Sequence, residues 1–345
     1  MHGLILQGGG SRGAYQAGVI LALSEILPQR ESPFTSISGV SVGAINASIL
    51  AMEANNFRKG ALRLKNYWMH LGHQDVYDIG KYGIFSAWKK LLSNQGHDAA
   101  FFENAPLTQF LDPKLDWQAI HNHSQRLFSP RYLNIHAYNY TTAQNEIFTN
   151  FDRSAIKYSR YTKFNVEHII ASTSLPYIFP GKIIGEHAFG DGGFKLDEPA
   201  SAQIRQGCHK IMAISLDDGS DEKTSIIEHL FEAIFPDAVE SDFCKINQIN
   251  KSLPRYGFMN RSRYRKVETL LLRPSEENFP NKEKLIDTLP KSLAYFAKAL
   301  GIQDNPDSNI LNYIVFSPEY TDYLIKQGYD DAMQQKETIV HFFAS

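Results

Sequence analysis

One serine in this sequence has the local surroundings of an enzymatic nucleophile. The run Gly39-Val40-Ser41-Val42-Gly43 fits the pattern G-x-S-x-G, in which a serine occupies a sharp turn between a strand and a helix. A short buried strand is expected at residues 34–38, and residues 42–52 have the small and apolar side chains of a closely packed helix. Such a turn presents the Ser41 hydroxyl at the positive end of the helix dipole, where an oxyanion is stabilised. The pattern therefore indicates acyl transfer, with a plain tight turn in an α/β protein as the alternative interpretation.

A glycine-rich loop is the second feature that could take part in chemistry. It lies between an expected strand at residues 3–7 and an expected helix at residues 14–27, and reads Gly8-Gly9-Gly10-Ser11-Arg12-Gly13. The spacing fits G-x-G-x-x-G, but a dinucleotide site also needs an acidic residue where the second strand ends, and that strand leads into Ser41 instead. Successive glycine amides at a helix start also form a nest of N–H donors for negative charge. If the two strands are neighbours, the loop supplies an oxyanion hole beside Ser41, with Arg12 either bracing the loop or facing solvent.

A carboxylate among glycines is the third feature. Asp191 lies in Gly190-Asp191-Gly192-Gly193, directly after a hairpin-like segment at residues 182–189. Flanking glycines allow another group to approach the carboxylate closely, although an isolated Asp-Gly-Gly is also a common turn.

The composition is that of a globular protein without a nucleic-acid partner. Of its 345 residues, 43% are hydrophobic and 21% are charged, and the net charge is −2. These values exclude wholesale disorder and provide no basic field for nucleic acid. The cysteines and the clustered histidines lack the spacing of metal ligands, so we expect neither a metal nor another cofactor; these residues are Cys208, Cys244, His70, His73, His121 and His123.

The sequence also bears on where the protein acts. No positively charged leader precedes the first apolar run at residue 3, and no apolar run approaches the ~20 residues of a membrane span. The expected location is therefore the cytoplasm, with peripheral membrane contact and export without a signal left open. Basic and aromatic residues alternate between Lys251 and Lys266, which fits either a membrane-facing surface or a solvated face.

The order of elements predicts an α/β fold. Further strands are expected at residues 133–138, 146–149, 211–216 and 269–272, and further helices at residues 166–173, 199–206, 228–235 and 289–300. A helical, aromatic-rich insert occupies about residues 55–130; it either caps the site and lines an acyl groove or forms the core of a helical layer. We expect a catalytic core at residues 1–217 and a C-terminal extension at residues 218–345 that packs on the same domain.

Taken together, the three glycine-rich motifs resemble those of the patatin-like phospholipase family in order and spacing. The run Ala171-Ser172-Thr173-Ser174-Leu175-Pro176 is similar to another family segment, and residues 272–275 and 316–320 resemble stretches of bacterial members. Three positions depart from the family pattern without removing a reactive group: Gln7, Ser174 and Asp197.

The resemblance implies a three-layer α/β/α fold with a mostly parallel central sheet and a serine–aspartate dyad. Ser41 would attack an acyl ester, Asp191 would accept its proton, and loop amides, chiefly those of Gly9 and Gly10, would hold the oxyanion. Because an aspartate with the ordinary pKa of about 3.9 is a weak base at neutral pH, contact with Ser41 and a partly desolvated cleft would have to raise its basicity or stabilise the developing charge. Since no histidine takes part in such a dyad, we expect no acid limb of activity near the imidazole pKa of about 6.5. The implied activity is that of a phospholipase A or lysophospholipase, without a cofactor, on phospholipids or other acyl esters at a membrane or micelle surface. Neither the lipid head group nor the oligomeric state is predicted.

Three other functions remain as alternatives. A conventional Ser-His-Asp esterase would need a histidine later in the chain, namely His209, His229 or His341. An acyltransferase would share the first half of the reaction and pass the acyl group to an acceptor other than water. A non-catalytic nucleotide- or lipid-binding module would use the glycine loop without needing Ser41.

Overall fold

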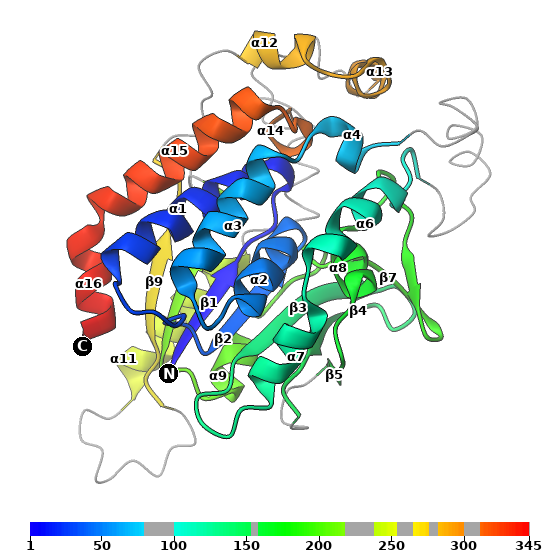
Figure 1. Ribbon diagram of the computed structural model, residues 1–345. Helices are drawn as coiled ribbons and strands as arrows, with labels where there is room; N and C mark the ends of the chain where they lie inside the picture. Colours follow the sequence, from blue (N-terminus) through cyan, green and yellow to red (C-terminus); the bar gives the residue numbers. More distant parts are fainter. Residues whose placement is uncertain are drawn as a thin grey trace.

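A mostly parallel sheet forms the centre of the molecule (Figure 1). The computed structural model describes residues 1–78, 100–152, 158–217, 238–253, 265–275, 282–299 and 311–344. The strand order is β5-β4-β3-β2-β1-β8-β9, with β7 also paired to β3 and β6 paired to β7. The strands are β1 (His2–Leu6), β2 (Ser36–Val40), β3 (Tyr132–Asn139), β4 (Gln144–Thr149), β5 (Ser159–Tyr161), β6 (Lys182–Ile184), β7 (His187–Asp191), β8 (Lys210–Ile214) and β9 (Glu268–Leu272).

Strand directions decide where the loops meet. Strands β3, β2, β1, β8 and β9 run parallel, whereas β4 and β7 run antiparallel to β3. The carboxyl ends of neighbouring parallel strands lie at one edge of a sheet, which is where α/β proteins place their sites. The loops that follow β1 and β2 therefore lie side by side.

Helices cover both faces of the sheet. They are α1 (Gly13–Ile26), α2 (Val42–Met52), α3 (Phe57–Met69), α4 (His73–Val76), α6 (Ala105–Leu111), α7 (Trp117–Ser124), α8 (Val166–Thr173), α9 (Ser201–Arg205), α11 (Ala238–Ser252), α12 (Lys282–Asp287), α13 (Lys291–Ala299), α14 (Leu311–Ile314), α15 (Pro318–Gln334) and α16 (Lys336–Ala344), with 3-10 turns η1 (Gly10–Arg12) and η3 (Asp112–Lys114). Among the described helices, none combines the length and the apolar character that crossing a bilayer requires.

Alternation along β1 and β8 shows how the three layers form. Leu4 and Met212 belong to the large core cluster with α1 and α2, whereas Ile5 and Ile211 belong to a second cluster with α11. Successive side chains of a strand point to opposite faces, so these near-continuous apolar strands need cover on both. The three-layer, mostly parallel α/β/α fold expected from the sequence is confirmed.

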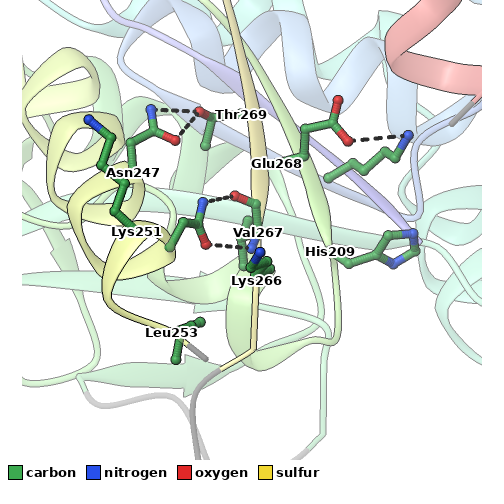
Figure 2. Close-up of a pocket in the computed structure, with 10 residues that line it drawn as sticks. His209, Asn247, Lys251, Leu253, Lys266, Val267, Glu268 and Thr269 are labelled. Atoms are coloured by element: carbon green, nitrogen blue, oxygen red, sulfur yellow. Dashed lines mark hydrogen bonds and ion pairs between the residues drawn. The ribbon is translucent and has the colours of Figure 1, made fainter. Parts of the chain in front are cut away.

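The outer edge of the sheet is covered by side chains of α11 (Figure 2). Asn250 acts like a neighbouring strand: its Nδ2 donates to Val267 O at 2.7 Å, and its Oδ1 accepts from Val267 N at 3.0 Å. Asn247 Nδ2 donates to Thr269 Oγ1 at 3.2 Å. The bonds of Asn250 occupy the backbone groups of the residue that directly precedes the edge strand β9, and Asn247 holds α11 beside that strand.

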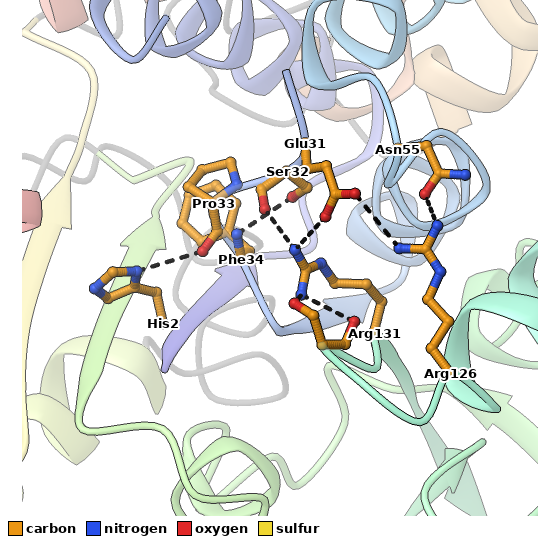
Figure 3. A network of polar contacts seen from close by, with 9 residues as sticks. His2, Glu31, Ser32, Pro33, Phe34, Asn55, Arg126 and Arg131 are labelled. Carbon is orange, nitrogen blue, oxygen red and sulfur yellow. Dashed lines mark hydrogen bonds and ion pairs between the residues drawn. The ribbon is translucent and has the colours of Figure 1, made fainter. Parts of the chain in front are cut away.

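A polar network joins the loop before β2 to the loop before β3 (Figure 3). Arg131 Nη2 contacts Glu31 Oε2 at 3.3 Å and donates to Ser32 O at 3.2 Å, and Arg126 lies 3.9 Å from the other oxygen of Glu31. Because these residues precede β2 and β3, the network lies at the amino edge of the sheet, opposite the loops that follow β1 and β2.

Where the structure describes it, the aromatic insert packs as a helical layer. Tyr67, Trp68 and Phe102 are 4%, 0% and 3% exposed and belong to the main core, which favours the core interpretation over an acyl groove for these side chains. Other aromatic residues of the insert, including Tyr82 and Trp88, lie outside the described residues, as do the helix expected at residues 228–235 and the basic residues between 254 and 264.

The C-terminal helices pack on the N-terminal helix. An added Cβ at Gly18 of α1 would lie 2.0 Å from Ile325 O, and one at Gly328 of α15 would lie 2.1 Å from Tyr15 O. Tyr15 also donates to the buried Asp331 Oδ2 at 3.1 Å. Helix α15 therefore contacts α1 backbone to backbone, and the two run side by side in Figure 1.

Candidate active site

Ser41 occupies the sharp turn that the sequence predicts. Strand β2 ends at Val40 and α2 begins at Val42, and Ser41 between them has φ 53° and ψ −126°. A non-glycine residue with positive φ is strained by about 1–3 kcal/mol and is typical of functional sites. The turn requires close contact between strand and helix: an added Cβ at Gly43 would lie 2.1 Å from Leu6 O, and one at Gly39 would lie 2.3 Å from Gly43 O.

Asp191 reaches Ser41 because β7 runs antiparallel to β3. As the last residue of β7, Asp191 pairs with Ala137 of β3, directly after His136, which pairs with Val40 at the end of β2. The Ser41 hydroxyl donates to Asp191 Oδ2 at 2.6 Å, and Gly193 N donates to Asp191 Oδ1 at 2.8 Å. The two side chains, separated by 150 residues, thus form a direct hydrogen-bonded pair.

Burial makes this carboxylate a stronger base than an ordinary aspartate. Asp191 is 3% exposed, and loss of hydration raises its pKa from 3.8 to about 6, against the opposing effects of the hydrogen bonds from Ser41 and Gly193. Burial therefore raises the basicity of Asp191, which is one of the two effects expected from the sequence. The expected absence of an acid limb near pH 6.5 is not supported, because a base with a pKa of about 6 loses its charge in nearly the same range.

Ser172, to which sequence reasoning assigned no role, holds the serine turn in place. Its Oγ accepts a hydrogen bond from Ser41 N at 2.9 Å and donates to His136 O at 2.6 Å. Ser172 lies in α8 and is fully buried, and its two hydrogen bonds connect the Ser41 turn to β3. The similarity of residues 171–176 to a family segment was the signal that could have pointed to Ser172. The sequence alone, however, does not show which groups the side chain of a helical serine bonds to.

The loop that follows Asp191, with Gly192 and Gly193, is held by backbone hydrogen bonds and by the side chain of one residue to which the sequence assigned no role. Asp191 N donates to Ser174 O at 2.9 Å, and Gly192 N donates to Ser172 O at 3.1 Å. Asn145, near the start of β4, donates from its Nδ2 to Gly192 O at 2.6 Å. Two of the three positions that depart from the family pattern lie near this loop. The backbone carbonyl of Ser174 accepts the hydrogen bond from Asp191 N, and Asp197 is exposed.

The glycine loop lies against the nucleophile. An added Cβ at Gly8 would lie 2.9 Å from Ser41 Cβ, and Gly10 begins the turn η1 that leads into α1. Within the described part of the chain, the backbone N–H groups of Gly8, Gly9 and Gly10 donate no hydrogen bond. N–H groups of this kind can donate to an oxyanion beside Ser41, and their role as an oxyanion hole stays a prediction.

The remaining loop residues are held in the interior. Ser11 and Arg12 are 1% and 9% exposed, and the Arg12 guanidinium lies 4.0 Å from the centre of the Tyr313 ring. Gly13 faces Trp68 and Val42, each 2.7 Å from an added Cβ. Of the two interpretations of Arg12, bracing the loop therefore fits better than facing solvent.

No histidine bonds to this pair within the described residues. His209 precedes β8, at the opposite edge of the sheet, where its Nδ1 lies 2.9 Å from the Met1 amino group. His341 lies in α16, and His229 lies outside the described residues. His136 is buried in β3, and burial lowers its pKa to about 4. Its Nδ1 lies 3.3 Å from Asn145 Oδ1. In the same part of the chain, no three His, Cys, Asp or Glu side chains are placed to hold a metal ion.

Comparison with solved structures finds chains of similar fold. VipD from Legionella pneumophila is 15% identical over 98% of this chain and 67% of its own, with a TM-score of 0.45. Human GIVD cytosolic phospholipase A2, in complex with methyl gamma-linolenyl fluorophosphonate and terbium chloride, is 12% identical over 100% of this chain, with a TM-score of 0.50. This chain covers only 59% of that human chain, and at such identity the likeness concerns the fold alone.

Sequence comparison identifies the family. No curated protein matches the chain by sequence. The sequence model of the family described as patatin-like phospholipase matches residues 4–202, which include all three glycine-rich motifs. Since that match covers more than half of its length, the chain belongs to the patatin-like phospholipase family.

Proposed function

We propose that this protein is a serine lipid acyl hydrolase of the phospholipase A or lysophospholipase type, acting through a Ser41–Asp191 dyad. Family membership supports lipid acyl hydrolase activity and a lipid substrate. The observation that carries the finer proposal is the 2.6 Å hydrogen bond from Ser41 to Asp191, made from a strained turn at the carboxyl edge of the sheet. A nucleophile bonded directly to its base is the arrangement that acyl transfer requires.

The reaction follows in two halves. Ser41 Oγ attacks the ester carbonyl carbon while its proton passes to Asp191, and the resulting oxyanion accepts hydrogen bonds from the N–H groups of Gly9 and Gly10. As the tetrahedral intermediate collapses, the alcohol leaves with the proton held by Asp191, and the acyl group remains on Ser41. A water molecule then attacks the acyl-enzyme and passes one proton to Asp191. As this second tetrahedral intermediate collapses, Asp191 returns the proton to Ser41 Oγ, which releases the fatty acid and restores the free serine and the ionised carboxylate.

The electrostatics of the pair suit this role near neutral pH. With a pKa of about 6, Asp191 is ionised at pH 7 to 8 and is more basic than an ordinary aspartate. General bases are most effective when their pKa lies close to the working pH. Burial thus supplies part of the basicity that a histidine supplies in a triad.

The proposal is tested by hydrolysis of two substrates, a labelled phospholipid in mixed micelles and soluble p-nitrophenyl butyrate. We expect Ser41→Ala to lose at least roughly 10³-fold in kcat, and Asp191→Asn to lose roughly 10²–10⁴-fold, with folding retained. Ser48→Ala is the matched control, because this buried serine, among the described residues, donates its side-chain hydrogen bond to Ala44 O of its own helix and does not contact the dyad. Activity of Ser41→Ala near the wild-type level on both substrates would refute the proposal.

A further inference from the structure

A short C-terminal segment, Tyr313 to Phe316, lies directly on the glycine loop. It belongs to the part of the chain beyond the family match at residues 4–202. Helix α14, which contains Tyr313, contacts the turn η1 and lies close to α4 (Figure 1). The loop that begins α1 therefore has a neighbour contributed from about 300 residues later.

The contact with the loop involves both the backbone and the side chain of Tyr313. Gly10 has φ +57°, and an added Cβ there would lie 2.0 Å from Tyr313 O, so the two backbones touch with no room for a side chain. The Arg12 guanidinium lies 4.0 Å from the centre of the Tyr313 ring. A cation over an aromatic face is an attractive contact, and it is stronger when desolvated, as it is for the buried Arg12.

The same segment is anchored on its other side to the helices that follow α2. Tyr77 Oη donates to Ile314 O at 3.1 Å, and Phe316 N donates to His73 Nε2 at 3.2 Å. The Phe316 ring stacks on Trp68 with ring centres 6.2 Å apart. A segment fixed in this way can hold the loop, because it cannot move without breaking contacts in the core.

We propose that Tyr313 is a positioning residue for the oxyanion hole, acting through Arg12 and Gly10 on the amides of Gly9 and Gly10. This assignment rests on the proposed function, in which those amides bind the oxyanion. Preorganised donors stabilise a transition state only when they are already aimed at the developing charge. The C-terminal extension thereby completes the site that the family-matched region begins.

The proposal predicts a loss in the chemical step rather than in substrate binding. With p-nitrophenyl butyrate, we expect Tyr313→Ala to lower kcat by roughly 10- to 100-fold, less than the ~10²–10³-fold loss typical of a deleted oxyanion donor. KM should stay within about twofold of wild type. Tyr313→Phe keeps the ring over Arg12 and should restore kcat to within about threefold of wild type.

A matched control and a double-mutant cycle separate positioning from general damage. Tyr329→Ala removes another tyrosine of the extension, one that donates to Glu25 on the surface of α1 and not to the loop, and should keep wild-type kcat. If the ring acts through the guanidinium, Arg12→Gln and Tyr313→Ala will be non-additive, and the double variant will be no worse than the poorer single variant by more than about threefold.

Several results would overturn the assignment. They are a Tyr313→Ala kcat within threefold of wild type, a rise in KM with kcat unchanged, an equal loss in Tyr329→Ala, or fully multiplicative losses in the cycle. Failure of the proposed function looks different: wild-type protein would neither hydrolyse the ester nor react with a fluorophosphonate at Ser41, and the positioning role would fall with it.

Discussion

Replacing Asp191 by asparagine should make the protein more stable and inactive at once. The carboxylate is 3% exposed, and burial raises its pKa from 3.8 to about 6. At about 1.36 kcal/mol for each pKa unit, the ionised carboxylate destabilises the fold by roughly 3 kcal/mol. The hydrogen bonds from Ser41 and Gly193 both lower the pKa, so this figure already includes them.

The effect has a definite dependence on pH. Because the folded-state pKa of Asp191 lies above its ordinary value of 3.8, the folded protein binds this proton more tightly than the unfolded chain does. The destabilisation is therefore complete above about pH 6 and disappears as the pH falls toward 4. Asparagine carries no charge at any pH. We expect Asp191→Asn to exceed wild type in free energy of unfolding by up to about 3 kcal/mol at pH 8 and by about half of that at pH 5.

Asparagine can keep the local geometry. Its Oδ1 can accept from Gly193 N, and its Nδ2 can donate to Ser41 Oγ, since a hydroxyl both donates and accepts. The variant thus loses the base without leaving a buried polar group unpaired.

Urea unfolding of both proteins at pH 8 and pH 5 measures the difference. Asp197→Asn, a change at an exposed position in the following loop, should leave the free energy of unfolding within about 0.5 kcal/mol of wild type at both pH values. A difference between Asp191→Asn and wild type that is the same at both pH values, or larger at pH 5, would show that the carboxylate is not destabilised by burial.

Three further predictions concern the same site. In Ser172→Ala, Ser41 N loses its buried acceptor, so urea unfolding should show a loss of about 1–3 kcal/mol and kcat should fall roughly tenfold; unchanged values of both would contradict the role of this bond. In Gly43→Ala, the new Cβ would lie 2.1 Å from Leu6 O, so destabilisation by about 3 kcal/mol or more is expected, and a soluble, fully active variant would refute the close contact. Wild-type kcat/KM should fall as the pH drops through about 6, because Asp191 must be ionised to accept the Ser41 proton; a profile flat down to pH 4.5 would exclude a base with this pKa.

Local sequence was sufficient to predict the separate pieces of the site. Gly39 and Gly43 mark the turn at Ser41, and the strand, loop and helix around Gly8 to Gly13 follow from composition and spacing. Helix α8 was predicted with the observed bounds, since Asn165 caps it and its apolar residues recur with helical spacing.

Contacts between distant segments could not be predicted in the same way. The hairpin β6–β7 was expected, but its pairing with β3, which brings Asp191 to Ser41, depends on tertiary structure. Other contacts of the site are also long-range: the hydrogen bonds of Ser172 and Asn145, and the close backbone contact between Tyr313 and Gly10. The single helix expected at residues 289–300 was wrong at its start, because Pro290 separates α12 from α13.

Helix α15 was not predicted, although its start signal is local. Ser317 precedes the helix as its N-cap, with a side chain that accepts from Tyr320 N, and Pro318 is the first helical residue. Its charged and polar outer face obscured the apolar residues that pack on α1, including Leu324 and Ile325. The close backbone contacts at Gly18 of α1 and Gly328 of α15 depend on the tertiary packing of the two helices, which the local sequence does not determine.

The most direct measurement of the central claim is site mapping of a covalent fluorophosphonate adduct by mass spectrometry on the native protein. If Ser41 is the nucleophile and Asp191 its base, wild type will carry one adduct on the peptide that contains Ser41, Ser41→Ala will carry none, and Asp191→Asn will react at least roughly 10²-fold more slowly. An adduct on any other residue, or labelling of Ser41→Ala at the wild-type rate, would contradict the account.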